Sequence, residues 1–389
     1  MKSNKWTLAL AAAGVVTLGT TTQAEEAQHQ VMTALSQTTL SGYVDTVAMW
    51  NVGTGNGGGI VGRSYDGGAG SAGKLDGFSL NLVNLTLEKA VDEGAWSAGY
   101  KAELLLGPDS VGYNQFTGTG DFGLGDAYVA LRAPVGNGID FKVGSFGTVV
   151  GYEVFNASNN PNYSRSYGFF LEPFQHTGVL ASYQLTENIG VSAGVANTWN
   201  TGVNSRAAAA LTAESQKTYM GSIVLTAPES FGFLAGSTLY GGVVDGIDAT
   251  GAQGMETTSY YAGATVPTPV EGLAVGVAYD YVNDLGGIDN RAYAVAGYLS
   301  YQATEKMRIN GRVDYTNADD GIFYASATAG NHNELFSVTG TLDYSLWANV
   351  LSRLEVRWDK ALNGESIYAG SVPTKENAVT VAANIVYKF

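Results

Sequence analysis

From Thr39 to the end of the chain, apolar residues alternate with polar or small residues at a period of two. The alternation comes in segments of about ten to fourteen residues rich in Val, Tyr, Thr, Ala and Gly, which is typical of β-strands with two unlike faces. It predicts sixteen strands, at residues 39–51, 79–90, 95–107, 124–133, 139–147, 176–186, 189–199, 217–227, 235–246, 256–266, 272–283, 291–303, 307–317, 334–346, 350–360 and 376–389.

The connections between these strands alternate in length. One set consists of tight turns, at 91–94, 135–138, 187–188, 228–234, 267–271, 304–306 and 347–349. The other set is mostly long, at 52–78, 108–123, 148–175, 200–216, 247–255, 284–290, 318–333 and 361–375. Short turns on one side and long loops on the other are typical of an outer-membrane barrel, whose turns face the periplasm. We therefore predict an all-β fold, a transmembrane antiparallel β-barrel.

The alternation also assigns the two faces of each strand. In segment 350–360, Leu354, Val356 and Trp358 share one face. The opposite face carries Arg353, Glu355, Arg357 and Asp359. A soluble sandwich alternates in the same way but turns its charges outward and its aliphatic residues into a dry core. Periodicity alone leaves both architectures open.

Three further observations favour the membrane barrel. The prolines all lie outside the strand interiors, as a closed sheet without edge strands requires. The tryptophans after the N-terminal segment lie near predicted strand ends, where aromatic girdles meet lipid headgroups. The chain ends in Tyr387-Lys388-Phe389, with Phe389 on the apolar face of the last strand. This terminus resembles the signal by which bacterial insertion machinery recognises outer-membrane barrels, so that machinery and outer-membrane lipid are expected partners.

One predicted strand does not alternate cleanly. In segment 79–90, Leu80 and Leu82 are out of phase with Val83, Leu85 and Leu87. A single extra residue in one strand produces such a phase change, so we expect a β-bulge or a bend near Leu82 and Val83.

Composition narrows the possible functions. Charged residues make up 14% of the chain, against roughly 25% in ordinary globular proteins. There are 20 Lys and Arg against 35 Asp and Glu, a net charge of −15 with no basic run, which argues against a nucleic-acid partner. The absence of cysteine excludes disulfides, thiolate metal sites and a cysteine nucleophile. We expect no cofactor, no metal and no enzymatic activity.

The first residues have the pattern of an export signal. Lys2 and Lys5 precede an apolar stretch from Trp6 to Leu18, and Thr22-Gln23-Ala24 forms a small-residue cleavage site. We therefore expect a signal peptide at 1–24, a short periplasmic segment at 25–38 and the outer-membrane barrel at 39–389. The expected location is the bacterial outer membrane.

Several stretches resemble a known family. They are LSGYVDTVAMWNVGTGN (40–56), NLVNLTLEKAVDEGAWSAGYKAELLLGPD (81–109) and DAYVALRAPVGNGIDFKVGSFGTVVGYEVFNASNNPNYSRSYGFFLEPFQHTGVLASYQL (126–185). They are similar to the OmpL-like β-barrel porins of bacterial outer membranes, mainly over the first half of the barrel region. The resemblance implies a pore-forming barrel and supplies no substrate.

A barrel of this size has room for a water-filled lumen. We expect passive diffusion of small hydrophilic solutes and ions, with the third long loop, 148–175, narrowing the channel. Two alternatives stay open, a substrate-specific channel for sugars or phosphate and a non-conducting structural or adhesive barrel. Tyr163, Tyr167, Phe169 and Phe170 are the aromatic residues that could line a sugar track. A homotrimer is expected only by analogy with general porins.

Selectivity should depend on charges that face the lumen. The candidates from the predicted strand faces and from the third loop are Lys101, Glu103, Arg132, Lys142, Glu153, Arg165, Glu172, Arg308, Arg312, Arg353 and Arg357. One hypothesis sets acidic loop groups across water from a basic wall, which would create a transverse field. The other has the basic residues paired with Glu103, Asp140, Asp314 and Glu355, which would stiffen the wall.

Overall fold

The computed structural model describes residues 38–53, 76–110, 114–115, 122–200, 206, 215–247, 256–285, 289–328, 330–369 and 372–389. The expected signal peptide and most of the expected 25–38 segment lie outside these residues. The strands are β1 (Thr39–Asn51), β2 (Gly77–Lys89), β3 (Ser97–Leu106), β4 (Asn114–Gln115), β5 (Phe122–Ala133), β6 (Ile139–Gly147), β7 (Gln175–Thr186), β8 (Ile189–Ala196), β9 (Thr218–Thr226), β10 (Thr238–Ile247), β11 (Glu256–Pro267), β12 (Leu273–Asn283), β13 (Arg291–Gln302), β14 (Met307–Ala318), β15 (Asn333–Trp347), β16 (Val350–Ala361) and β17 (Asn377–Lys388).

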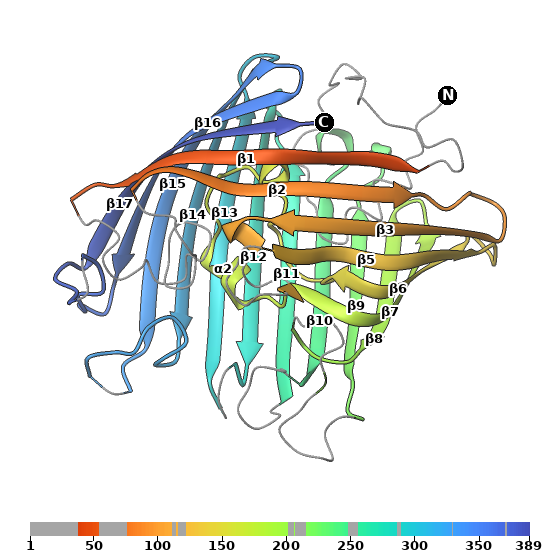
Figure 1. Cartoon of the computed structure of the whole chain (residues 1–389), viewed down its shortest axis with the longest axis horizontal. Coiled ribbons are helices and arrows are strands. Elements are labelled where there is room, and N and C mark those ends of the chain that lie inside the picture. Colours follow the sequence, from red (N-terminus) through yellow and green to blue (C-terminus); the bar gives the residue numbers. More distant parts are fainter. Residues whose placement is uncertain are drawn as a thin grey trace.

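These strands form one antiparallel sheet that closes on itself. Each long strand pairs with its neighbours in the chain, β1 pairs with both β2 and β17, and the short β4 pairs only with β5. The result is a sixteen-stranded barrel. In Figure 1, β1 to β7 cross in front of β10 to β16, which run down the rear of the ring.

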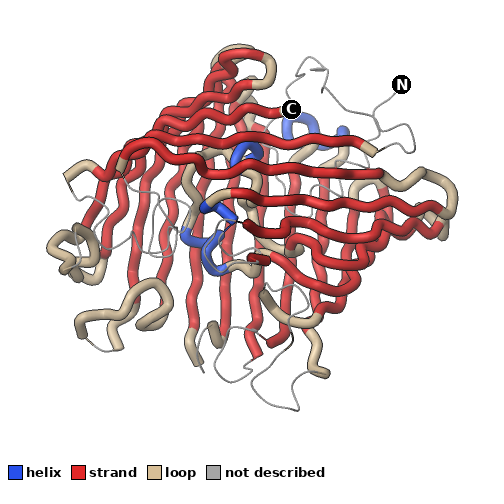
Figure 2. The backbone as a smooth tube through the Cα atoms, viewed as in Figure 1, coloured by secondary structure: helices blue, strands red, loops and turns tan. Residues whose placement is uncertain are grey.

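Among the residues that the structure describes, helical segments are few and short. They are η1 (Pro108–Ser110), η2 (Ala157–Asn159), η3 (Glu229–Leu234) and the α-helix α2 (Tyr167–Leu171). Figure 2 shows how little helix accompanies the strands. In the described part of the chain, no helix is long and apolar enough to cross a membrane.

The strand prediction is confirmed for all sixteen long strands, with ends that agree to within three residues. The expected irregularity in β2 is confirmed as well. Asp45 pairs with Leu82 and Thr46 pairs with Leu80, so Asn81 is the extra residue of a bulge. Because Asn81 and Leu82 both point inward, the phase of the apolar face changes between Leu80 and Val83.

The outward face is apolar and carries aromatic residues near the loop end of the strands. Tyr279, Tyr293 and Tyr315 lie on adjacent strands with ring centroids 6.4 and 6.1 Å apart. Such a row is the aromatic girdle expected of a membrane barrel. One expected girdle residue is different, because Trp199 is buried inside the barrel, where its indole N–H donates to Ser259 Oγ.

Candidate functional site: the third loop and the two walls of the lumen

The third loop, residues 148–174, connects β6 to β7 and enters the barrel instead of leaving it. Its first residues, Val149 and Val150, pack with Val244 of β10 in the interior apolar cluster. Tyr152 stacks on Tyr298 of β13, with ring centroids 4.1 Å apart and an interplanar angle of 14°. These apolar contacts hold the start of the loop against the inner face of the sheet.

The helix α2 lies towards the end of the loop and contacts β12, β13 and β14. Ser166 begins this helix, and its hydroxyl accepts a hydrogen bond from Phe169 N–H. Tyr167 is fully buried, its hydroxyl donates to Asp359 Oδ1 of β16 at 2.7 Å, and its N–H donates to Asp314 Oδ1 of β14. Figure 1 shows α2 within the ring, between the front and rear strands.

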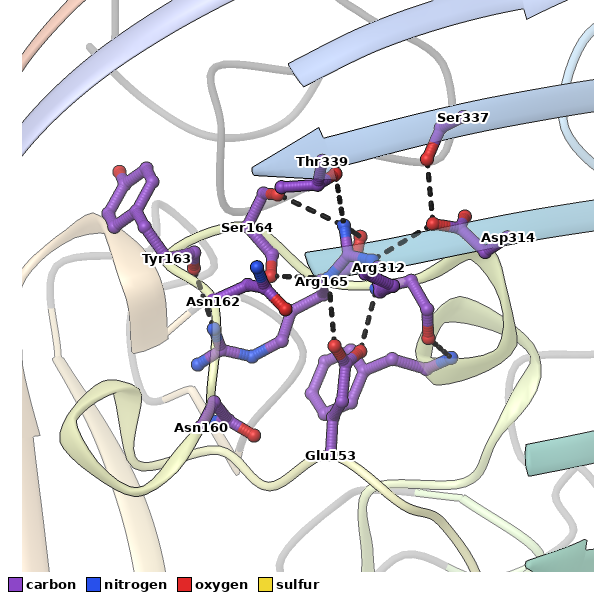
Figure 3. A network of polar contacts seen from close by, with 12 residues as sticks. Glu153, Asn160, Asn162, Tyr163, Ser164, Arg165, Arg312, Asp314, Ser337 and Thr339 are labelled. Atoms are coloured by element: carbon purple, nitrogen blue, oxygen red, sulfur yellow. Dashed lines mark hydrogen bonds and ion pairs between the residues drawn. The ribbon is translucent and has the colours of Figure 1, made fainter. Parts of the chain in front are cut away.

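Arg312 of β14 is the centre of the contact between loop and wall (Figure 3). Its guanidinium pairs with Asp314 at 2.9 Å on its own strand and with Glu153 of the loop at 2.8 Å. It also donates to the main-chain oxygens of Ser164 and Arg165. The second oxygen of Glu153 accepts from Ser166 N–H. This one side chain thus joins both arms of the loop to the barrel.

On β16, charges two residues apart share the inner face and bind the loop backbone. Arg353 donates to the main-chain oxygens of Ala157 and Asn160, at 2.6 Å each. Glu355 accepts from the main-chain N–H groups of Tyr163 and Ser164. Arg357 donates to Arg165 O and pairs with Asp359, while Arg353 pairs with Asp343 of β15. We call this surface the arginine wall; it consists of Arg312, Asp314, Arg353, Glu355, Arg357 and Asp359.

A second charged surface lies on the strands that Figure 1 draws at the front. Lys101 Nζ is 3.0 Å from Asp126 and 4.0 Å from Glu103. Lys142 Nζ lies 5.1 Å from the centre of the Tyr128 ring; among the described residues it has no ion pair within 4.0 Å. We call this surface the lysine wall; it consists of Lys101, Glu103, Asp126, Tyr128 and Lys142.

The two walls differ in the exposed fraction of their charged side chains. The side chains of Arg312 and Glu153 are 0% exposed, whereas those of Lys101 and Asp126 are 23% and 19% exposed. A charge that water and ions reach is screened and can act on permeating ions, whereas a buried pair is held in place by its partners. The arginine wall is therefore an attachment surface, and the lysine wall remains accessible from the lumen.

The family of the protein follows from its sequence. The family model described as "Putative beta-barrel porin-2, OmpL-like" matches residues 37–389. The chain belongs to this porin family. No curated protein matches it.

Solved structures show the same fold at low sequence identity. The outer membrane channel DcaP of Acinetobacter baumannii superimposes with a TM-score of 0.58 and 13% identity, covering 92% of this chain and 99% of that one. The anion-selective porin from Comamonas acidovorans gives 0.58 and 14%, covering 90% and 99%. OmpF of Salmonella typhi, solved with daunomycin, gives 0.59 and 12%, covering 90% and 97%. The protein is an outer-membrane porin, a channel of the bacterial outer membrane.

The other predicted site residues of this porin lie in several places. Arg132 pairs with Asp140 at 2.6 Å near a short turn. Arg308 donates to Gln302 Oε1 at the turn end of β14. Arg165 stays within the loop and donates to the main-chain oxygens of Tyr163 and Phe155. Phe389 exchanges two main-chain hydrogen bonds with Gly42 of β1, beside the seam where the porin closes.

Glu172 directly follows α2 and, among the described residues, forms no ion pair with the arginine wall or with the lysine wall. It is buried beside Asp280 of β12. Burial raises the pKa of the Glu172 carboxyl well above its usual value, and the nearby charges of Asp280 and Glu153 raise it further. The raised pKa favours the protonated form of Glu172, and the side-chain hydrogen bond between Glu172 and Asp280 joins this end of the loop to the sheet.

Sequence reasoning missed several residues of this site. Asp280 faces inward beside Glu172 of the loop, and Asp343 faces inward and pairs with Arg353 of β16. The alternation places Asp359 on the inner face but does not reveal its pair with Arg357. Tyr167 was considered only as an aromatic track residue. The signal for Asp280 and Asp343 was available, because each lies between two outward-facing aromatic or apolar residues. Asp280, for example, lies between Tyr279 and Tyr281, whose side chains point outward.

Proposed function

We propose that this porin forms a water-filled channel for the passive diffusion of small hydrophilic solutes and ions, narrowed by the third loop. The observation that carries the proposal is the unequal exposure of the two walls. The loop is attached to the arginine wall through buried contacts, and the lysine wall keeps water-accessible charges. Permeating ions would then pass between the loop and the lysine wall.

The geometry does not favour a transverse field on the arginine side. Such a field needs water between acidic loop groups and basic wall groups, but Glu153 and Arg312 are in direct contact and inaccessible. We propose instead that selectivity depends on Lys101, Glu103, Asp126 and Lys142, with Arg308 as a further charge near the turn end.

A substrate-specific channel is the second candidate. It would need an aromatic track along the lumen, and three of the four aromatic candidates in the loop, Tyr163, Tyr167 and Phe169, are buried. Phe170 is partly buried against Phe323 of the loop that follows β14, with ring centroids 5.1 Å apart. These positions favour a general-diffusion channel rather than a sugar-specific one.

Planar-bilayer recording tests the proposal. We expect an open channel whose conductance rises in proportion to salt concentration without saturating. Saturation by one sugar or by phosphate would favour the substrate-specific channel, and absence of conductance would favour a structural or adhesive barrel. Lack of turnover with ester or peptide substrates would agree with a transport function without enzymatic activity.

We also propose that the mature protein begins near residue 25 and assembles as a homotrimer. The first proposal rests on the export-signal pattern of residues 1–24. The second rests on the fold shared with other porins. N-terminal sequencing of protein from outer membranes would test the first, and native mass measurement in detergent would test the second. A mass of one chain at concentrations that keep other porins assembled would contradict the trimer.

A further inference from the structure

A groove of about 410 Å³ lies at the short-turn end of the barrel, under the turn between β9 and β10. Its floor is a row of cross-strand neighbours on four adjacent strands: Ile189 pairs with Leu225, Leu225 with Leu239, and Leu239 with Ala264. This volume falls within the range of small-molecule sites, roughly 300–1,000 Å³. The groove has no part in the channel proposed above.

The groove opens to the outside of the barrel. Leu239 of β10 is exposed. Val244 of β10 and Met220 of β9 point to the opposite face of the sheet and are buried in the interior cluster. Side chains of a strand alternate between faces, and Leu239 and Val244 are an odd number of residues apart. Since short turns of such barrels face the periplasm, the groove faces the periplasmic leaflet of the membrane.

The turn forms the rim of the groove, and its helical segment η3 contacts β11. Pro228 and Phe231 line the groove from the turn, opposite Ala264 and Val266 of β11. Gly232 and Gly236 have φ of 62° and 80°, a conformation that costs glycine little. Phe231 is exposed, at the height where aromatic rings meet the membrane interface.

The groove is lined almost entirely by apolar surface, and the turns at its turn end are acidic. Asn188 and Ser237 are its lining residues at this end, and the Ser237 hydroxyl is buried. Exposed Glu187, Glu229 and Glu271 lie on the three turns around this end. Segments 186–190, 226–238 and 266–273, which form these turns, contain no lysine or arginine.

We propose that this groove binds a glycerophospholipid of the periplasmic leaflet whose headgroup carries an ammonium group, with one acyl chain along the apolar row. The hydrocarbon lies on Leu225, Leu239 and Ala264, and the headgroup lies at the turn end, near Glu187 and Glu229. The ammonium group is attracted by the surrounding carboxylates, which repel a lipid with net negative charge. The ligand class is thus an ethanolamine lipid and not a glycerol-headgroup one.

Native mass spectrometry of the purified porin with an equimolar mixture of dioleoyl phosphatidylethanolamine and dioleoyl phosphatidylglycerol tests this inference. We expect one retained lipid per chain, with the ethanolamine lipid preferred by roughly three- to tenfold, as expected for a few solvated charge pairs. Equal retention of both lipids, or preference for the glycerol lipid, would overturn the headgroup assignment.

Two pairs of variants locate the site. Ala264→Phe fills the groove and should abolish the retained lipid, whereas Ala262→Phe, on the same outward face but outside the groove, should leave it. The double variant Glu187→Gln, Glu229→Gln should keep a bound lipid and lose the preference, whereas Glu93→Gln on a distant turn should keep both. Heat-modifiable gel mobility checks that each variant folds. If Ala264→Phe retained as much lipid as the wild type, or changed the oligomeric state without losing the lipid, the groove would not be a lipid site.

Discussion

Both charged walls of the lumen combine basic with acidic side chains, but the two walls have different environments. On the arginine wall, every guanidinium has an acidic partner and a loop main-chain oxygen, and the pair of Arg312 and Glu153 is inaccessible to water. On the lysine wall, Lys101 and Asp126 are paired but partly exposed, and Lys142 contacts an aromatic ring. The comparison shows that facing the lumen does not make a charge part of the pore, because a loop can cover it.

The choice of arginine suits the covered wall. A guanidinium has five N–H donors in a planar arrangement and can bind a carboxylate and main-chain oxygens at once, as Arg312 and Arg353 do. A lysine ammonium is a compact, strongly hydrated charge. It suits a surface that water reaches.

The largest expected effect is that of Arg312→Ala. Removing one partner of a buried pair costs about 3–5 kcal/mol, because Glu153 and Asp314 would remain buried without it. The loss should appear as local opening of the third loop, since the barrel keeps its own sheet hydrogen bonds. Hydrogen exchange of the amides of Ser164, Ser166 and Tyr167 should speed up by roughly two to four orders of magnitude.

Arg308→Ala is the matched control for Arg312→Ala. Arg308 lies on the same strand and on the same face but is only partly buried. It donates a hydrogen bond to Gln302, interacts electrostatically with Asp343 of β15, and has no hydrogen bond or ion pair with the third loop among the described residues. Exchange of the loop amides should stay within a few-fold of the wild-type rate. Equal effects of the two substitutions would show that Arg312 does not hold the loop.

Tyr167→Phe should have a smaller effect on the same attachment. It removes the hydroxyl that donates to Asp359 and leaves the ring contacts with Phe323 and Arg357 in place. Loss of a buried hydrogen bond to a charged group costs about 1–3 kcal/mol. Exchange of the α2 amides should rise by less than in Arg312→Ala, and a change as large as in that variant would mean that the ring had also moved.

Lys142→Glu tests the lysine wall. Two unit charges a few ångströms apart interact by about 1 kcal/mol in water. Reversing one lumen charge should therefore shift the cation-to-anion permeability ratio roughly two- to fivefold towards cations. Reversal potentials across a potassium chloride gradient measure this ratio.

Lys360→Glu provides the control for that measurement, because it makes the same change of charge outside the lumen. Lys360 is on the outward face of β16 at the loop end, partly exposed beside Glu376. It should leave the permeability ratio unchanged. A larger shift in the double variant Arg353→Ala, Arg357→Ala than in Lys142→Glu would mean that ions follow the arginine wall.

Local pattern was enough for the strands and for the direction of their side chains. The period of two placed Arg312, Arg353 and Arg357 on the inner face, and the phase change in β2 located its bulge to within a residue or two. These features depend on neighbouring residues in one strand. They are therefore visible in the sequence.

The partners of these side chains could not be predicted in the same way. Glu153 and Arg312 are 159 positions apart, and their contact depends on barrel closure and on the inward path of a loop without regular structure. Trp199 shows the same limit. It lies three residues beyond the end of β8, where the alternation has ended, so the sequence did not show that it lies inside.

The attachment differs at the end of α2, where Glu172 of the loop meets the carboxylate of Asp280 and not an arginine. The raised pKa of Glu172, caused by burial and by Asp280 and Glu153, means that the folded loop binds a proton more tightly than the unfolded chain. That contribution is complete below the ordinary glutamate pKa of about 4.5 and is lost as pH rises towards the raised value.

Exchange of the α2 amides, corrected for the intrinsic pH dependence, should therefore increase from acidic to alkaline pH. Glu172→Gln, which keeps a neutral hydrogen-bonding group, should remove most of this dependence, whereas Glu153→Gln should weaken the loop at every pH. A wild-type loop that tightened as pH rose would contradict a protonated Glu172 and would place the proton elsewhere in the site.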